Sequence, residues 1–393
     1  MQNWATICGH REAGDIGCAR RRSPFVNALI ERIYASVAPE ISIDLGTANT
    51  PVHVRGHGVR FVEPTMVAID TDTGEILTVG EGAKQMLGRT PRKIAVIRPM
   101  RNGVISNYRY TEALINQLLE RAMRKRPLVP PRVIVGVPGS ASDVEKKAVR
   151  EAAMGAGAGR VYFVPQAMAS AVGAGLPVLE PQASMIVDIG GGTTEIAVIS
   201  IGGMVSAQSL KLGGDFLDEA IVSHLRSTRG FLIGERTAEA LKIALGYYGR
   251  PAGRPPRKVV GQDVRHLRPG TLEVREEDVG AAMAEPLGQI VDVVRSVLEQ
   301  TPPELVRDLA ENGMVLAGGG AAITGLAETL QLVTGMPVRQ ADQPMLCVAL
   351  GAAEILRDRK MFAALYPAPQ SVIGRWWRSL RFGMRESSSF SSR

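Results

Sequence analysis

Two short segments of this chain, 144 residues apart, share one pattern of residue types. Residues 43–50 are Ile-Asp-Leu-Gly-Thr-Ala-Asn-Thr, and residues 187–194 are Val-Asp-Ile-Gly-Gly-Gly-Thr-Thr. An apolar, β-branched run precedes and follows each copy, which is typical of a glycine-containing turn between two paired strands. The repeat therefore predicts two similar domains whose turns face one cleft.

The rest of the chain fits an α/β protein. Apolar runs at 41–43, 132–137 and 185–187 alternate with helix-forming stretches at 112–125, 142–155 and 286–299. Strands that alternate with helices are typical of sheets covered by helices. By composition, an extension reaches about Glu40, a glycine-rich body follows to about Tyr366, and a tail begins at Pro367.

Composition narrows the class of protein. The 393 residues are 45% hydrophobic, which is enough for two or more domains with real cores. The net charge is +7, but five Arg and one Glu of residues 367–393 supply much of it, so the body is not a surface for specific nucleic-acid binding. Three cysteines form no framework or zinc motif, and no apolar run approaches a membrane span, so we expect a cytoplasmic protein.

The acidic residue that opens each turn suggests a metal. A turn with Gly and Thr presents backbone N–H groups and hydroxyls to a phosphate. Asp44 and Asp188 would add one carboxylate from each side, as Mg²⁺ bound to a polyphosphate prefers. The alternative is that each Asp only caps its own turn. No GxxxxGK[ST] segment occurs, which excludes a P-loop protein.

Further glycines divide into two kinds. Gly318, Gly319 and Gly320 follow an apolar strand and precede a predicted helix, which is typical of close approach to a nucleotide. Gly213 and Gly214 open another predicted helix and are expected in the same pocket. The cluster of Gly155, Gly157 and Gly159 ends a helix instead, so helix capping explains it.

Taken in order, these motifs resemble the actin, Hsp70 and sugar-kinase ATPase superfamily, and within it the MreB family of bacterial actin homologues. The narrower resemblance rests on residues 79–91, 97–105, 233–243, 301–305 and 344–356, and it extends from about Ile41 to Leu356. It implies a two-lobed actin-like fold in which each lobe is a mixed five-stranded sheet flanked by helices. It also implies a first domain at 41–183 with a small insert at about 70–100, rejoined by about 345–366, and a second at 184–344 with an insert at about 222–282.

The same resemblance implies roles for particular residues. Gly46, Thr47, Ala48 and Asn49 would form the first phosphate loop, and Gly190, Gly191, Gly192 and Thr193 the second. Gly318, Gly319 and Gly320 would lie against the adenosine, and Glu239 and Lys242 would contact ribose and base. For this last pair, the spacing alone favours an ordinary solvated ion pair on one helix face. Segments near Ser140 and Pro344 would form the hinge.

Three positions depart from the family pattern. Gln166 stands where the family has a Glu that positions the attacking water. Eukaryotic actin also has a Gln at this place. A Gln orients water but cannot accept its proton, so we expect slow, assembly-dependent ATP hydrolysis in which Asp188 and Thr193 also take part. The alternative is no hydrolysis at all. Pro51 predicts an irregularity in its strand, and Asn107 replaces a usual acidic residue.

Both ends carry features of surface contact. Apolar residues between Phe25 and Val37 lie on one side of a predicted helix that follows three arginines, which suits an anionic membrane surface. The alternative is a helix docked on its own domain. In the tail, Trp376 and Trp377 interleave with arginines, which fits lipid or a protein partner better than nucleic acid.

We therefore expect an MreB-like protein that binds ATP or GTP with Mg²⁺, polymerises head to tail and lies at the cytoplasmic membrane. The resemblance implies as partners the protein itself, in a filament or paired filaments, and cell-wall elongation proteins such as MreC, MreD and RodZ. Two alternatives stay open. One is a nucleotide-locked scaffold with little turnover, and the other is a small-molecule kinase of the same superfamily, for which no catalytic Asp motif was found.

Overall fold

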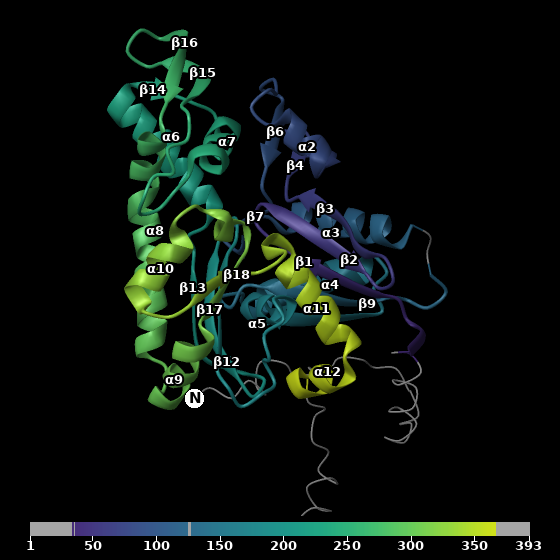
Figure 1. Cartoon of the computed structure of the whole chain (residues 1–393). Coiled ribbons are helices and arrows are strands. Elements are labelled where there is room, and N and C mark those ends of the chain that lie inside the picture. The colour runs from purple at the N-terminus through teal and green to yellow at the C-terminus, as the bar shows by residue number, and fades with distance from the viewer. Residues whose placement is uncertain (1–33, 35, 125–126, 367–393) are drawn as a thin grey trace, which may run out of the picture.

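Two five-stranded mixed sheets form the framework, and their strand orders match. The computed structural model describes residue 34, residues 36–124 and residues 127–366 (Figure 1). The first sheet has the order β10-β9-β1-β2-β3, and the second has β18-β17-β11-β12-β13. In both sheets the first strand in sequence pairs parallel with one neighbour and antiparallel with the strand that follows it in the chain. The predicted α/β class with two mixed five-stranded sheets is confirmed.

The first lobe consists of the first sheet, its helices and a small insert. Its strands are β1 (Glu40–Asp44), β2 (Asn49–Val54), β3 (Gly58–Pro64), β9 (Arg132–Val137) and β10 (Arg160–Pro165). Its helices are α3 (Tyr108–Met123), α4 (Asp143–Gly155), α5 (Gln166–Gly173), α11 (Cys347–Arg357) and α12 (Arg359–Leu365). The insert holds β4 (Val67–Asp70), β5 (Ile76–Val79), α2 (Glu81–Met86) and β6 (Ile94–Ile97), and a short hairpin of β7 (Met100–Arg101) and β8 (Val104–Ile105) follows it.

The second lobe repeats this plan. Its sheet holds β11 (Ser184–Ile189), β12 (Thr194–Ser200), β13 (Gly203–Leu210), β17 (Met314–Ala317) and β18 (Val338–Gln340). Its helices are α6 (Gly214–Arg229), α7 (Glu235–Leu245), α8 (Glu276–Glu299), α9 (Pro303–Asn312) and α10 (Leu326–Thr334), with 3-10 turns η2 (Gly319–Ala322) and η3 (Pro344–Leu346). The insert sheet consists of β14 (Phe231–Leu232), β15 (Arg257–Asp263) and β16 (Arg268–Val274).

The central strands are apolar on both faces because helices cover both faces. In β9, Val133 and Val135 pack against α3 and α4, while Ile134 between them packs on the opposite side with α5 and α11. In β11, Met185 and Val187 face α6, α8 and α10, while Ile186 joins the same core as Ile134. This strict alternation is the two-residue period of a strand that is buried on both sides.

Helices α5 and α11 therefore lie between the two sheets, in a core to which both lobes contribute. Gly173 of α5 and Gly351 of α11 lie where the two helices cross. A Cβ atom added at Gly351 would lie 2.5 Å from the backbone nitrogen of Gly173. The two helix backbones touch, and the lobes are joined through this crossing.

Two departures from the family pattern have local explanations. Pro51 stays paired with Val62, but the register of β2 and β3 shifts between Val52 and His53, so the predicted irregularity lies next to the proline. Asn107 is the N-cap of α3 and its side-chain oxygen accepts a hydrogen bond from the Tyr110 nitrogen at 3.3 Å. An Asn does this as well as an acidic residue.

Three other predictions concern the end of α4 and the two terminal segments of the chain. As predicted, α4 ends at Gly155, and Gly157 beyond it has a φ of +100°. The amphipathic segment ending at Val37 and the Trp/Arg tail lie almost entirely outside the described residues. Within those residues, no helix is both long and apolar enough to cross a bilayer.

Candidate nucleotide-binding site

The two acidic turns meet between the lobes. Asp44 lies at the end of β1 and Asp188 near the end of β11. The Gln166 side-chain nitrogen, at the first residue of α5, donates a hydrogen bond to Asp44 Oδ1 at 2.9 Å. Among the described residues, neither carboxylate accepts a hydrogen bond from its own turn, so the turn-capping alternative is wrong.

Asp188 is buried and Asp44 is half-buried, and no cation among the described residues neutralises either carboxylate. Burial raises the pKa of Asp44 to about 7, repulsion from Asp188 adds to the shift, and the Gln166 hydrogen bond opposes it. Burial likewise raises the pKa of Asp188 to about 6. No Lys or Arg in the described part of the chain forms an ion pair with either group. Two sheltered acids that repel one another form a site suited to a divalent cation.

The glycines of the two turns allow the turns to touch. A Cβ atom added at Gly191 would lie 2.5 Å from the Cβ of Ala48 and 3.1 Å from its backbone nitrogen. A Cβ atom at Gly192 would overlap the side chain of Thr47. Thr47 and Thr193 are both buried at this junction, whereas Asn49 is exposed at the start of β2. Any larger residue at Gly191 or Gly192 would push the lobes apart.

Gly213 and Gly214 join the second turn to α6. The Gly214 nitrogen donates to the Gly190 oxygen at 3.0 Å, and the nitrogen of Asp215 donates to the Gly191 oxygen at 2.8 Å. A Cβ atom at Gly213 would lie 2.7 Å from the Gly191 oxygen, so this position also needs glycine. The start of α6 is thus fixed to the second acidic turn.

Lys242 reaches the same place from α7. Its Nζ donates to the Gly214 oxygen and to Asp218 Oδ2, both at 2.8 Å. The half-buried Glu239, one turn earlier, contributes to the raised pKa values of Asp215 and Asp218, whose largest cause is burial. The alternative of a solvated Glu239–Lys242 pair is wrong, because Lys242 pairs with Asp218 instead.

The third glycine cluster also borders Asp188. Gly318 has a φ of +76°, and a Cβ atom there would lie 2.5 Å from Asp188 Oδ1. Its nitrogen donates to the Pro344 oxygen at 2.8 Å, which ties the cluster to the start of the last helices. Gly319 and Gly320 begin the 3-10 turn η2, and α10 starts only at Leu326. The predicted helix after the glycines is confirmed, although Ile323, which was expected within it, lies before its start.

The β7–β8 hairpin is an element of the site that was not predicted from the sequence. The β7–β8 hairpin turns at Asn102 and Gly103, which have φ values of +51° and +72°. The Gly103 nitrogen donates to Thr47 Oγ1 at 3.2 Å, and a Cβ atom at Gly103 would lie 2.6 Å from Thr193 Cγ2. The Asn-Gly pair is the strongest short hairpin signal and would have located the turn, though not its contact with both phosphate loops.

Glu195 is a second residue that sequence reasoning missed. It lies on β12 opposite Asp188, and it accepts hydrogen bonds from Ser209 Oγ at 2.7 Å and from the Gly139 nitrogen at 3.3 Å. Burial raises its pKa to about 7 in spite of these bonds. Gly139 follows β9, so this contact also joins the two lobes. Strand position alone gives no signal for it.

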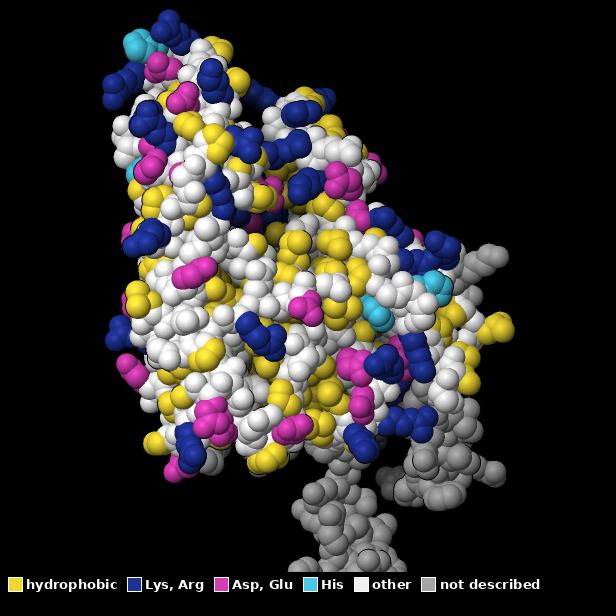
Figure 2. Space-filling view, viewed as in Figure 1, with side chains coloured by type: hydrophobic (Ala, Val, Ile, Leu, Met, Phe, Trp, Pro, Cys, Tyr) yellow, Lys and Arg dark blue, Asp and Glu magenta, His cyan; other side chains and the backbone are white. Residues whose placement is uncertain are grey.

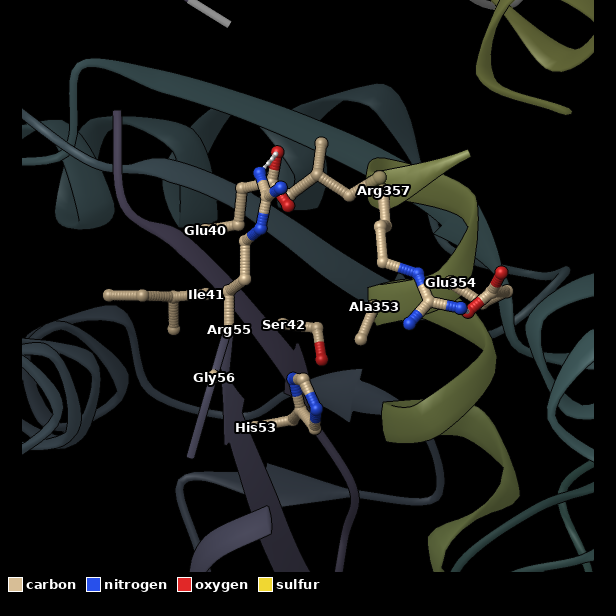
Figure 3. Close-up of a pocket in the computed structure, with 10 residues that line it drawn as sticks. Glu40, Ile41, Ser42, His53, Arg55, Gly56, Ala353, Glu354 and Arg357 are labelled. Carbon is tan, nitrogen blue, oxygen red and sulfur yellow. Dashed lines mark ion pairs between the residues drawn. The ribbon is translucent and has the colours of Figure 1, made fainter. Parts of the chain in front are cut away.

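The surface is hollowed above this junction. Figure 2 shows a cleft between the two insert sheets, with Lys and Arg side chains on both sides of it. Two open cavities lie elsewhere, beside β1, β2 and the last helices, with volumes of about 120 and 380 Å³. Glu40 borders both cavities and pairs with Arg55 at 3.3 Å (Figure 3). Arg132 pairs with the same carboxylate at 2.9 Å. None of the predicted site residues lines either cavity.

Comparison with known proteins agrees with this arrangement. The family model described as MreB/Mbl protein matches residues 38–364. The chain is 44% identical over 335 residues to the cell shape-determining protein MreB of Escherichia coli, covering 84% of this chain and 96% of that protein. It is 40% identical over 319 residues to the cell shape-determining protein Mbl of Bacillus subtilis, covering 81% and 96%.

Solved structures show the same fold. MreB5 of Spiroplasma citri bound to ADP superposes with a TM-score of 0.79 at 30% identity, covering 84% of this chain and 99% of that one. A MamK double helical filament matches with a TM-score of 0.69 at 21% identity, covering 82% and 99%, which supports the fold alone. With two matching lobes, paired acidic turns and this degree of identity, the chain belongs to the MreB/Mbl family.

Proposed function

We propose that this protein is an MreB-like bacterial actin that binds a nucleotide between its lobes, assembles into filaments and determines cell shape. The observation that carries the proposal is the meeting of Asp44 and Asp188 from equivalent turns of the two sheets. Relatives named for cell-shape determination and structures bound to ADP and AMPPNP support it.

The residues present fit Mg²⁺ with a triphosphate. The described residues contain no cluster of three or more His, Cys, Asp or Glu that could hold a metal by itself. Asp44 and Asp188 would therefore share the ion with phosphate oxygens and water, as Mg²⁺ commonly requires. The glycine turns would donate backbone N–H groups to the phosphates, and Lys242 with Glu239 would lie beside the nucleoside. When bound, the metal neutralises phosphate charge and orients the terminal phosphate.

Gln166 would orient the attacking water. Its side chain is buried and held by Asp44, so it is fixed in the site. An amide can position water but cannot remove its proton. Hydrolysis would then depend on positioning and on neutralisation of charge, and it would be slow. A filament that binds nucleotide with little turnover is the second candidate, and Gln166 is the observation that favours it.

Replacement of Gln166 by Glu tests this role. The new carboxylate would face Asp44, and like-charge repulsion would raise its pKa toward neutrality, where it can act as a general base. We expect single-turnover phosphate release at least about tenfold faster than in the wild type, within the range for general-base catalysis. Gln166→Ala, which removes the positioning group, should release phosphate more slowly than both. A Glu variant no faster than the wild type would contradict the role assigned to Gln166.

The two ends of the second lobe differ in charge and suit head-to-tail contact. At one end, residues 257–268 contain four Lys or Arg and one Asp; at the other, residues 299–311 contain four Asp or Glu and one Arg. The ends lie at opposite extremes of the lobe, at β15–β16 and at α9 (Figure 1). A heterologous contact between unlike ends extends indefinitely, which supports a filament.

Each end also presents an apolar residue at a hairpin tip. Leu267, between β15 and β16, is 76% exposed with a φ of +51°. Ile201, between β12 and β13, is 72% exposed with a φ of +52°. Large apolar residues are unusual in this backbone region and are costly to leave in water. Both positions are suited to burial against another copy of the chain.

Leu267→Asp is expected to suppress assembly. It removes an apolar contact and adds a negative charge to a basic end that would meet an acidic one. We expect the concentration needed for sedimentation with ATP to rise by about tenfold or more, and wild-type assembly to weaken with added salt. Leu332→Asp, at a residue 85% exposed on the side of α10, is the matched control and should have little effect. Equal sedimentation of both variants and the wild type would exclude this end from the contact.

The proposed membrane contact and the cell-wall partners rest on the sequence and its resemblance. The elements expected to reach the membrane fall outside the described residues. A peripheral location at the inner face of the cytoplasmic membrane and binding to cell-wall elongation proteins therefore stay predictions.

A further inference from the structure

Arg98 joins the two lobes at the mouth of the cleft. It follows β6 in the first lobe's insert, and its guanidinium lies between carboxylates of the second lobe. Nη1 is 3.6 Å from Asp215 Oδ1 at the start of α6, and Nη2 donates to Glu235 Oε1 at the start of α7. One side chain thus holds two helices of the opposite lobe.

This contact is more sheltered than an ordinary surface ion pair. The side chains of Arg98 and Asp215 are 21% and 23% exposed, whereas Glu235 is 46% exposed. Nη1 is buried and makes no hydrogen bond within the described part of the chain. Glu239 of α7 also faces the guanidinium, while Lys242 acts on Asp215 from the other side. Water competes poorly for the Arg98 guanidinium in such a place, so its pair with Asp215 is stronger than an exposed one.

The contact is connected directly to the phosphate turns. The Asp215 nitrogen donates to the Gly191 oxygen, so the carboxylate held by Arg98 belongs to a residue bonded to the second turn. Five residues after Arg98, Gly103 lies against Thr47 and Thr193, one residue from each turn. The segment from Arg98 to Gly103 therefore crosses the cleft between the mouth and the phosphate site.

We propose that Arg98 is a positioning residue that holds the lobes closed over bound nucleotide and sets the rate at which the nucleotide leaves. The inference rests on the proposed nucleotide site. A ligand held by turns of both lobes leaves when the lobes separate, and separation must break both Arg98 ion pairs. Exposed ion pairs across the mouth of the cleft are weaker, so breaking them should slow separation of the lobes much less.

The structure supplies a matched control three residues away. Arg101 pairs with Glu219 of α6 at 3.3 Å across the same gap, but these side chains are 68% and 65% exposed. Exposed pairs contribute little, because water and salt screen them. Comparing the same substitution at Arg98 and at Arg101 therefore distinguishes loss of a sheltered ion pair from loss of an exposed positive charge at the cleft.

The test measures release of a radiolabelled, non-hydrolysable ATP analogue from full-length protein with Mg²⁺, after addition of excess unlabelled ATP. We expect release about tenfold faster from Arg98→Gln, equivalent to about 1.4 kcal/mol, and less than twofold faster from Arg101→Gln. Glu235→Gln removes the same contact from the opposite lobe and should also accelerate release. The double variant Arg98→Glu with Glu235→Arg should recover part of the wild-type rate.

Release from Arg98→Gln and Glu235→Gln within twofold of the wild-type rate would overturn the inference while leaving the nucleotide site intact. A wild-type protein that takes up no analogue would refute the proposed function, and the role of Arg98 with it.

Discussion

Asp188→Asn is expected to weaken Mg²⁺-dependent nucleotide binding strongly and, without nucleotide, to make the protein more stable. The amide keeps the shape of the side chain but removes one of the two charges that would hold the metal. Loss of one of two carboxylate ligands should weaken binding of ATP with Mg²⁺ by at least about a hundredfold, or about 2.7 kcal/mol. Calorimetric titration with ATP and Mg²⁺ measures this loss.

The gain in stability follows from the direction of the pKa shift. Burial raises the pKa of Asp188 to about 6 from an ordinary value of 3.8, so the folded protein binds its proton more tightly than the unfolded chain does. Wild-type stability therefore falls as the pH rises from about 4 to about 6, and the cost persists at neutral pH. A shift of this size corresponds to about 3 kcal/mol, which the Asn variant avoids.

Urea unfolding at pH 7.5 without nucleotide or Mg²⁺ measures the expected gain in stability of Asp188→Asn. The control is Asp292→Asn, at an exposed position of α8, which should change the free energy of unfolding by less than about 0.5 kcal/mol. An Asn variant that unfolds at lower urea than the wild type would show that the Asp188 charge is stabilised rather than strained. If Asp188→Asn binds ATP and Mg²⁺ with wild-type affinity, Asp188 is not a ligand of the metal.

Gly351→Ala is expected to be among the most destabilising single methyl additions in the described structure. A Cβ atom at Gly351 would overlap the Ala169 carbonyl oxygen and lie 2.5 Å from the Gly173 nitrogen. All of these atoms are backbone, so no side chain can rotate away. Helices α5 and α11 would have to separate, and overpacking of this kind costs about 3 kcal/mol or more.

A matched substitution gives the opposite sign. Gly155 is the last residue of α4, is exposed, and has nothing within 4 Å of an added Cβ atom. Gly155→Ala should leave stability unchanged or raise it by up to about 1 kcal/mol, because alanine favours the helix. Thermal unfolding of both variants compares them. A Gly351→Ala protein as stable as Gly155→Ala would contradict the backbone contact between α5 and α11.

The same crossing links stability to the site, because α5 begins with Gln166 and the segment before α11 bonds to Gly318. Separation of these helices would therefore displace groups on both sides of the nucleotide. We expect soluble Gly351→Ala protein to lose nucleotide binding as well as stability.

The fold and the two acidic turns were predictable from local sequence. Each Asp-Gly turn lies between two apolar strands, and the strand pattern needs no distant contact to be recognised. The resemblance added Gln166 and Lys242, which the structure places beside the turns. Their partners, Asp44 and Asp218, come from elements 122 and 24 residues away in sequence.

What could not be predicted depends on contacts between distant segments. Arg98 looks like any exposed arginine until the fold brings α6 and α7 beside it, 117 and 137 residues further along the chain. The contact of Gly103 with both phosphate loops is equally non-local. The helix expected after Gly318, Gly319 and Gly320 starts only at Leu326, because the 3-10 turn η2 comes first.

Sedimentation of the full-length protein with ATP and Mg²⁺, with ADP and Mg²⁺, with ATP and a chelator, and without nucleotide tests the central claim most directly. If the paired turns hold one metal-bound nucleotide that controls assembly, the protein should sediment with ATP and Mg²⁺ and far less without nucleotide or metal. Sedimentation that is the same in all four conditions, or absent from all of them, would contradict this account.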